Sequence, residues 1–380
     1  MEKKEIIIFS EYYLPKLGGV ERYTNKLVEE LKVKYNITIV TTILDGVESY
    51  EQQENVRILR VPVYNIFKNR YAFIKKNKKL KEIMREIGKV KYNFLICQTR
   101  FFPMTSFGAK YAKKNRIPMI VIEHGSSHFS INNRILDFFG KIYEHHITNR
   151  LKKKCSNYYG VSERCVSWLK HFKIDALGVL YNSIDHKDYK KFKDKYYFKN
   201  NGKDINICYA GRLIKEKGVY ELCDAFNQLI KEYKNIKLNI AGDGPILNDL
   251  KLKYSNNKNI KFLGKLDFEN VMKLYNSCDI FVYPSMYPEG LPTSILEAGL
   301  MKCAVVATDR GGTIEVITHN KDGLICEENI QSIHDNIKKL LDNHKLLDEY
   351  KEKLHKRIIE NFTWNVTAKK LSDIIEKEGR

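Results

Sequence analysis

The sequence lacks the markers of several protein classes. Its eight cysteines include no Cys-x-x-Cys pair and no His/Cys group at zinc spacing, and most stand in apolar runs, where a thiol behaves as a small hydrophobe. We therefore expect neither disulfides nor a metal, and a reducing, cytoplasmic setting. The first residues, Met1-Glu2-Lys3-Lys4-Glu5, lead straight into a short strand rather than a secretory signal. No run reaches the roughly 18 apolar residues that a membrane span needs.

Two nucleotide-site motifs are missing as well. No Gly-x-Gly-x-x-Gly follows the first predicted strand, which argues against a dinucleotide-dependent dehydrogenase. No Asp-x-Asp pair occurs anywhere, and the nearest substitute is Asp267-Phe268-Glu269. No recognisable nucleic-acid-binding module is present either, so we expect no nucleic-acid partner.

The chain is long enough for two domains. Its 380 residues exceed the usual size of a single core, and an apolar fraction of 43% is sufficient to form real cores. In the first half, apolar runs of strand length alternate with helical periods, which is typical of a parallel, doubly wound α/β sheet. Ligands bind such sheets beyond the carboxyl ends of the strands. We expect these strands at residues 5–10, 37–42, 56–61, 94–98 and 118–123.

The second half repeats the alternation after a polar connection. A lysine-rich stretch of low hydrophobicity runs from Tyr181 to Asp204 and predicts a link between domains. Beyond Asn329 the periodicity predicts mainly helix, as far as Ile375. Between the link and these helices we expect strands at residues 205–210, 236–241, 260–263, 279–283, 304–307 and 324–326.

Positive charge is concentrated in the first half. Residues 1–182 carry 33 Lys and Arg against 17 Asp and Glu, a net charge of +16, whereas the remaining chain has a net charge of +4. The segment from Lys68 to Lys81 mixes bases with aromatics, a composition suited to an anionic membrane surface. A lysine-rich genome would also raise the count of bases. We favour a first half that faces a membrane or a phosphate-bearing lipid.

Two glutamates eight positions apart form the most informative motif, Glu289-Gly290-Leu291-Pro292-Thr293-Ser294-Ile295-Leu296-Glu297. A strand precedes the motif, and Pro292 predicts the start of a helix. Glu289 would then lie in a loop beyond the strand and Glu297 inside the helix. Free N–H groups at such a helix start can hold a phosphate. Two solvated acids are the alternative that the spacing alone leaves open.

Further candidates follow the predicted strands. Arg212 and Lys217, flanked by Gly211 and Gly218, could clamp a diphosphate, although a solvated basic loop would look similar. Small residues that let a ligand approach the backbone, or that simply make turns, are Gly18, Gly19, Gly242 and Gly244. His124, in Glu123-His124-Gly125, ends another strand and is either a site residue or an ordinary loop histidine.

Together these motifs resemble the retaining GT-B glycosyltransferases of family four along almost the whole chain. The elements that carry the resemblance, in the order of that family, are Gly18–Arg22, Glu123-His124-Gly125, Asn182-Ser183-Ile184-Asp185, Ala210-Gly211-Arg212 with Lys217, Gly242-Asp243-Gly244-Pro245, Pro284-Ser285 and residues 289–297. Ser183 stands where the family usually has glycine, and Tyr287-Pro288 is looser than the common pattern.

The resemblance implies an architecture and a set of residue roles. Two Rossmann-like domains would face each other across a cleft: an acceptor-side domain, residues 1–182 joined by a C-terminal helix at 364–380, and a nucleotide-sugar domain, residues 183–363. It implies that His124 contacts the donor sugar near the reacting carbon and that Glu289 binds sugar hydroxyls. The donor-binding residues that it implies are Gly18, Gly19, Gly211, Arg212, Lys217, Gly242, Gly244, Gly290, Leu291, Pro292, Thr293 and Glu297.

The implied activity is transfer of a sugar from a nucleotide-diphosphate sugar, which we expect to be linked to UDP, with retention of configuration. Arg212, Lys217 and the helix start would replace a divalent cation, so we expect no metal and no cofactor. The acceptor would be a glycan or lipid-linked hydroxyl in bacterial surface-polysaccharide synthesis, at the inner face of the plasma membrane. A UDP-sugar epimerase and a non-catalytic sugar-nucleotide-binding protein are the alternatives.

Overall fold

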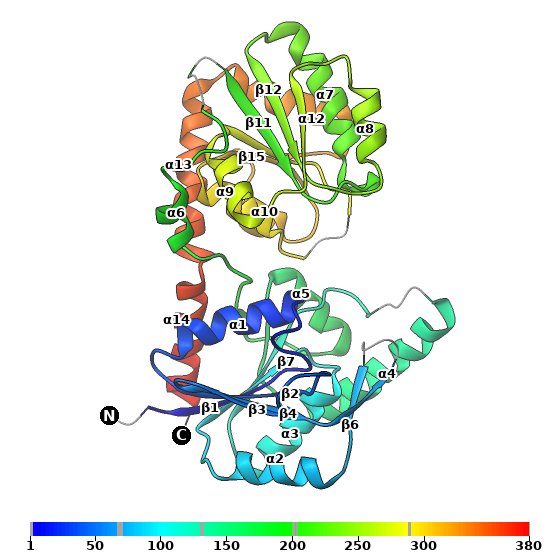
Figure 1. Cartoon of the computed structure of the whole chain (residues 1–380), viewed down its shortest axis with the longest axis vertical. Helices are drawn as coiled ribbons and strands as arrows, with labels where there is room; N and C mark the ends of the chain where they lie inside the picture. Colours follow the sequence, from blue (N-terminus) through cyan, green and yellow to red (C-terminus); the bar gives the residue numbers. More distant parts are fainter. Residues whose placement is uncertain are drawn as a thin grey trace. The chain divides into compact units, whose positions relative to one another are not determined.

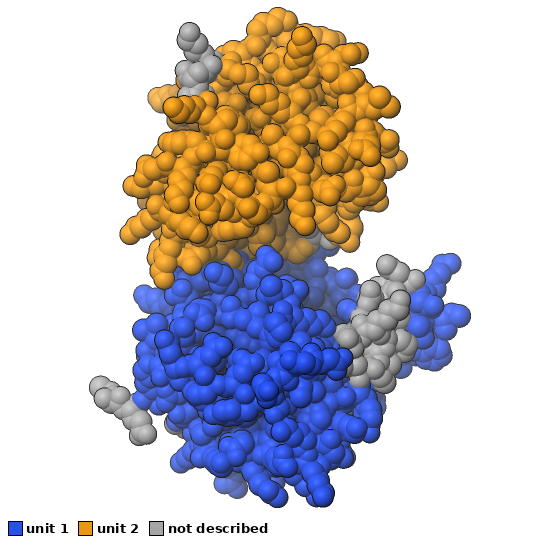
Figure 2. All heavy atoms as spheres, viewed as in Figure 1, with its two compact units in different colours: residues 1–182, 364–380 blue, residues 183–363 orange. Residues whose placement is uncertain are grey.

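The computed structural model describes residues 3–66, 71–129, 133–199, 202, 204–287 and 290–379. The chain divides into two compact units, coloured separately in Figure 2. Unit 1 comprises residues 1–182 and 364–380, and unit 2 comprises residues 183–363.

Unit 1 is built on an eight-stranded sheet in which every neighbouring pair is parallel except β3 with β4 (Figure 1). In the order of the sheet its strands are β10 (Gly178–Val179), β9 (Tyr158–Gly160), β8 (Met119–Glu123), β7 (Phe94–Gln98), β1 (Glu5–Phe9), β2 (Asn36–Thr42), β4 (Val56–Val61) and β3 (Tyr50–Gln53). The strand order reverses between β1 and β7, which places a crevice for ligands beyond the carboxyl ends of these strands.

Helices cover both faces of this sheet, which explains why β1 is apolar and buried at every position from residue 6 to residue 9. Ile6 and Ile8 of β1 pack with α1 (Gly19–Leu31) and α14 (Trp364–Glu378) in one core. Ile7 and Phe9 point to the other face. The second core there includes residues of α2 (Lys78–Gly88), α3 (Pro103–Asn115), α4 (Arg134–Lys152), α5 (Glu163–Leu169) and the 3₁₀ helix η1 (Lys170–Phe172).

Unit 2 contains a six-stranded, wholly parallel sheet. In the order of the sheet its strands are β13 (Ile260–Gly264), β12 (Ile236–Ala241), β11 (Ile205–Ala210), β14 (Ile280–Tyr283), β15 (Ala304–Thr308) and β16 (Leu324–Cys326). Counted within the unit this is the order 3-2-1-4-5-6 of a dinucleotide-binding fold, with its switch point between β11 and β14.

Two helices of unit 2 contribute residues to the pocket described below: α9 (Phe268–Asn276) and α10 (Thr293–Leu300). The 3₁₀ helix η2 (Lys215–Lys217) precedes α7 (Val219–Glu232). The others are α6 (Lys187–Phe192), α8 (Leu247–Lys253), α11 (Thr313–Val316), α12 (Ile330–Leu341) and α13 (His344–Asn361).

The structure confirms the fold class and corrects one local expectation. The expected link from Tyr181 to Asp204 contains α6, whose Phe192 is completely buried, so this segment packs on unit 2 rather than only connecting domains. The basic segment from Lys68 to Lys81 overlaps a hairpin of β5 (Val63–Ile66) and β6 (Tyr71–Ile74) and the start of α2. Residues 67–70 lie outside the described residues. All eight cysteines are described and buried, and none of them forms a disulfide.

No helix in the described part of the chain combines the length and the apolar character that crossing a membrane requires.

Candidate functional site

The loops beyond three strands of unit 2 line a pocket of about 500 Å³. Its wall brings together five of the predicted donor-binding residues: Gly211, Arg212, Gly242, Gly244 and Glu297. Further lining residues are Ala210, Ala241, Asp243, Lys265, Leu266, Val271, Tyr275 and Ser294. Because β11 and β12 end here and α10 begins here, the pocket lies at the edge of the sheet where a doubly wound fold binds its ligand.

Two of the pocket glycines are required by contact between loops. A Cβ at Gly242 would overlap the carbonyl oxygen of Gly211, and one at Gly244 would overlap that of Leu213. The loop after β12 therefore packs backbone against backbone on the loop after β11. The sequence suggested glycine at these two positions so that a ligand could approach the backbone or a turn could form. The structure shows a further reason, because any side chain there would collide with the neighbouring loop.

The two predicted clamp cations gather around one tyrosine ring. The guanidinium carbon of Arg212 lies 5.9 Å and the ammonium of Lys217 5.5 Å from the ring centre of Tyr287. Arg212 is exposed, whereas Lys217 is buried and donates a hydrogen bond of 3.1 Å to the hydroxyl of Tyr283. Lys217 is therefore not part of a solvated basic loop, and its charge acts more strongly on a nearby anion because the side chain is desolvated.

The start of α10 forms another side of this region. Pro292 is its N-cap, and the described residues provide no side-chain cap for the first N–H groups. Gly290 accepts a hydrogen bond of 2.9 Å from the N–H of Gly312, and the neighbouring Leu291 is buried. Thr293 is the first helical residue. Pro288 and Glu289 lie outside the described residues, so the structure does not place the predicted sugar-binding carboxylate.

Glu297 is accompanied by a tyrosine that the sequence did not point to. Tyr275 of α9 lines the same pocket, is completely buried, and its hydroxyl has no hydrogen-bond partner within the described part of the chain. Burial and then the charge of Glu297 raise the pKa of Tyr275 well above its usual value, so the hydroxyl keeps its proton. A neutral donor therefore stands near the Glu297 carboxylate in the wall of the pocket.

Unit 1 contains the other predicted site residues. His124 follows β8, its Nε2 lies 2.7 Å from Oε1 of Gln98, and its ring meets that of Tyr23 edge to face at 4.8 Å. Burial lowers the pKa of His124 to about 3, so the ring is neutral near pH 7. Tyr23 belongs to α1, which begins at Gly19, where an added Cβ would meet nothing within 4 Å. Gly18, the N-cap, is also exposed.

A buried ionic network supports the loop that carries His124. One oxygen of the Glu123 carboxylate accepts hydrogen bonds from the N–H groups of His124, at 3.1 Å, and Gly125, at 2.8 Å. The other oxygen pairs with Arg100 at 2.7 Å. Arg100 also pairs with Glu144 at 2.9 Å, and all three side chains are fully buried. The network therefore anchors the loop to β8 and α4.

Two family matches divide the chain between them. Residues 17–188 match the family described as Glycosyltransferase Family 4, and residues 190–361 match the family described as Glycosyl transferases group 1. The chain belongs to the group 1 glycosyltransferases. It is 29% identical over 394 residues to the uncharacterized glycosyltransferase MJ1069 of Methanocaldococcus jannaschii, with 99% of each chain covered. It is 26% identical to the alpha-monoglucosyldiacylglycerol synthase of Acholeplasma laidlawii, with 73% of this chain and 74% of that one covered.

Solved structures of other glycosyltransferases share the fold. HepE of Anabaena, determined in complex with UDP, has a TM-score of 0.72 at 16% identity and covers 98% of this chain and 100% of its own. Sucrose-phosphate synthase of Thermosynechococcus elongatus has a TM-score of 0.67 at 15% identity and covers 99% of both chains. The group 1 glycosyltransferase described here therefore has the GT-B fold.

Several site residues of this glycosyltransferase were not found from its sequence. Tyr275 and Tyr283 stand in apolar segments and read as core residues. Arg100 belongs to no motif, and the motif Glu123-His124-Gly125 pointed to His124 rather than to Glu123. The sequence offered one sign of the buried network: the strand Met119–Glu123 ends in a carboxylate where an apolar residue would be expected. A buried charge needs a partner, so this glutamate predicts a paired cation nearby.

Proposed function

We propose that this protein is a retaining hexosyltransferase that uses a nucleotide-diphosphate sugar, with UDP as the nucleotide. The observation that carries the proposal is the pocket of unit 2, where Arg212 and Glu297 line one cavity and Lys217 stands beside Arg212 at the ring of Tyr287. Cations next to a hydroxyl-binding carboxylate suit a nucleoside diphosphate. HepE, which shares the fold, was solved with UDP and with UDP-glucose, in keeping with this choice.

Breaking the sugar–phosphate bond leaves negative charge on the diphosphate. Arg212, the desolvated Lys217 and the N–H groups at the start of α10, near Thr293, would stabilise that charge and make a divalent cation unnecessary for transfer. Glu297 would bind the ribose hydroxyls. Gly211, Gly242 and Gly244 would form the floor beneath the nucleotide, and Gly290, Leu291 and Pro292 would shape the loop before α10.

Transfer with retention needs the acceptor on the face that the diphosphate leaves. A phosphate oxygen can take the acceptor's proton, so no protein nucleophile is required, and the protein's task is to position the sugar. His124, held neutral, would hydrogen-bond a donor-sugar hydroxyl near the reacting carbon, and Glu289 would bind others. Gly18 and Gly19 would let phosphate or acceptor approach the backbone. Unit 1 would thus serve the acceptor and unit 2 the nucleotide sugar.

Incubation of the enzyme with UDP-, GDP- and dTDP-sugars, without acceptor, tests the donor. We expect slow release of free sugar and UDP from one UDP-sugar, because water replaces the missing acceptor, with the released sugar first appearing in the configuration of the donor. The readout is chromatography of nucleotides together with NMR of the anomeric proton. Rapid conversion of the UDP-sugar into its epimer, with no release of UDP, would instead identify an epimerase, and binding without any turnover would identify a non-catalytic protein.

We further propose that the acceptor is lipid-linked and that unit 1 docks on an anionic membrane, at the inner face of the plasma membrane. The first turns of α4 are exposed and apolar: Ile135, Phe138, Phe139 and Ile142 are each more than half exposed. Residues 1–182 of this unit have a net charge of +16, so an exposed apolar face here could insert into a membrane whose anionic lipids attract the surrounding bases. The name of the Acholeplasma relative, a glucosyldiacylglycerol synthase, denotes a lipid product and supports this choice.

Flotation with liposomes tests the membrane proposal. We expect the protein to bind vesicles of anionic lipid at low salt, with binding reduced severalfold at high salt because surface attraction is screened. The double substitution Phe138→Ser with Phe139→Ser should release the protein. Leu252→Ser, which changes an even more exposed apolar residue of α8 in unit 2, is the control and should bind normally. Equal binding to neutral and anionic vesicles, or none to either, would contradict the proposal.

A further inference from the structure

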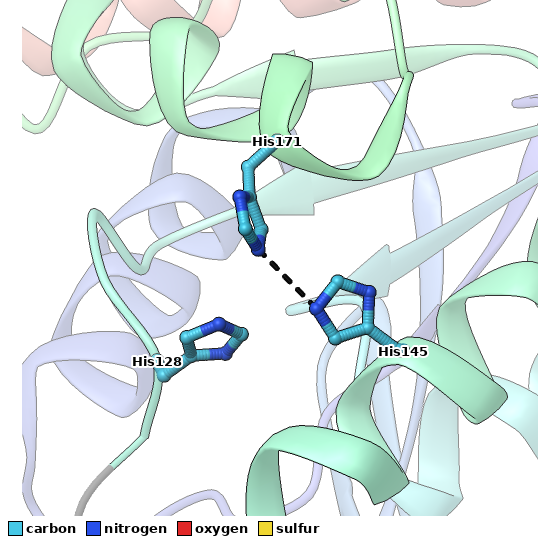
Figure 3. A group of neighbouring side chains, drawn as sticks. All are labelled: His128, His145 and His171. Carbon is cyan, nitrogen blue, oxygen red and sulfur yellow. Dashed lines mark hydrogen bonds between the residues drawn. The ribbon is translucent and has the colours of Figure 1, made fainter.

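Three histidines that are distant in the sequence converge in unit 1 (Figure 3). His128 lies in the loop after β8, His145 on α4 and His171 on η1, and their rings point toward one another. Each offers a ring nitrogen, and these three nitrogens all lie within 4.8 Å of one another. The spacing of 17 and 26 residues has no zinc-motif pattern, so the sequence predicted no metal group here.

The distance between two of the nitrogens matches shared coordination. Nε2 of His145 and Nε2 of His171 are 3.2 Å apart, joined by the dashed line in Figure 3. Two imidazole nitrogens bound tetrahedrally to zinc at about 2.0–2.1 Å would be about 3.3 Å apart. A divalent cation between them needs little movement of either ring, because the pair already has the separation of one edge of the tetrahedron.

An outer shell orients the third ligand. Nδ1 of His128 lies 3.1 Å from Oε2 of Glu144, which leaves its Nε2 available for a metal. Glu144 is itself fully buried, paired with Arg100 and bonded by the N–H of Phe129 at 2.8 Å. A carboxylate that accepts from the far nitrogen of a ligand histidine is the usual support of a zinc site, since it fixes the ring and raises its basicity.

Aromatic packing holds the outermost ligand. The indole of Trp168 stacks on the ring of His171, with the planes 5° apart and the centres at 4.7 Å. Phe172 meets the rings of His128 and His171 nearly edge-on. His171 is exposed while the other two histidines are half-buried, so an ion could enter from solvent on this side, and water could fill the fourth position.

We propose that His128, His145 and His171 bind a zinc ion. Three neutral imidazoles form a donor set that suits Zn²⁺ and other borderline transition metals. The ion would tie the loop after β8, which carries His124 four residues earlier, to α4 and η1. Its role would be to hold that loop. The site belongs to unit 1, so it is separate from the diphosphate-binding chemistry proposed for unit 2.

Metal binding by untagged, chelator-treated protein tests the proposal. With ZnCl₂ alone, titration calorimetry should give one ion per chain. His145→Ala and His171→Ala should each weaken the affinity for zinc at least about 10-fold. Even the loss of a residue that only supports a metal ligand typically weakens binding by about 10-fold or more. His146→Ala is the matched control, because this exposed histidine is the next residue of α4 and lies outside the cluster; it should bind as the unaltered protein does.

Cobalt provides a readout that does not depend on stability or activity. Co²⁺ should show the intense visible absorption of a tetrahedral site and quench Trp168, which stacks on a ligand and is one of only two tryptophans. Trp168→Phe should keep the absorption and lose most of the quenching. Absence of zinc binding by the unaltered protein, or binding that is unchanged in His145→Ala and His171→Ala, would overturn the proposal and leave the three rings as an aromatic packing cluster.

Discussion

Replacing Arg100 by methionine should lower the free energy of unfolding of unit 1 by about 3–5 kcal/mol, the cost of leaving a buried charge without its partner. Methionine keeps the volume but removes the cation that pairs with Glu123 and Glu144, both fully buried. Unfolding in urea followed by tryptophan fluorescence is the measurement. Both tryptophans, Trp168 and Trp364, belong to unit 1, so the signal reports on this unit.

The loss should also depend on pH. Burial already raises the pKa of Glu144 despite the opposing charge of Arg100, and removing Arg100 raises it further. A carboxyl whose pKa is higher in the folded than in the unfolded state holds its proton longer when folded, so its effect on stability becomes more unfavourable as the pH rises. The defect should therefore be larger at about pH 8 than at about pH 5.

Arg150→Met is the matched control for this prediction. Arg150 is an exposed residue of α4, and its loss should change stability by no more than about 0.5 kcal/mol. Adding Glu144→Gln to Arg100→Met should recover part of the loss, because it removes one of the uncompensated charges. A loss below about 1 kcal/mol in Arg100→Met would show that the network contributes little more than a surface pair.

Lys217→Met should reduce kcat/KM for the transferred sugar by about 10²–10³-fold, the range for removing one preorganised donor from a developing anion. Lys217 is buried and bonded to Tyr283, so its charge is weakly screened and its position is held before the donor binds. Arg212, exposed at the mouth of the pocket, should act more on binding: Arg212→Ala should weaken UDP by about 1.5–3 kcal/mol in titration calorimetry.

Lys215→Ala provides the control for both substitutions. Lys215 is an exposed lysine of η2, two residues before Lys217, so it tests whether any positive charge in this loop would serve. We expect near-normal kinetics and UDP affinity. Unchanged nucleotide affinity in both Arg212→Ala and Lys217→Met would rule out the diphosphate clamp, whereas failure of all three variants alike would indicate a damaged loop rather than a lost contact.

The fold class could be predicted because its signals are local. Apolar runs such as residues 6–9 and 207–210 indicate strands covered on both faces, and most strand bounds differ from expectation by a residue at most. The expected strands did not include β3, β5, β6, β9 or β10, and helix α6 was missed as well. β3 is antiparallel at the edge of its sheet and largely exposed, and α6 is only six residues long, so neither has a strong apolar period.

The sequence predicted which residue types line the candidate donor site, but not which of them are buried. Gly242 and Arg212 stand just after strands, and the parallel sheet brings such positions to one edge. Packing between helices and loops far apart in the chain decides that Lys217 rather than Arg212 is buried. The same packing places Tyr275 in the pocket wall, where its hydroxyl has no hydrogen-bond partner among the described residues.

The sequence by itself determined the alternation of strands and helices, the family, and the residues that stand at strand ends, because each of these is written in a few neighbouring positions. The tertiary structure alone decided that Arg100 joins Glu123 to Glu144, and that three histidines from a loop and two helices meet. The partners in these contacts lie 17 to 44 residues apart in the sequence, and no local period or spacing specifies which side chains will meet when the elements pack.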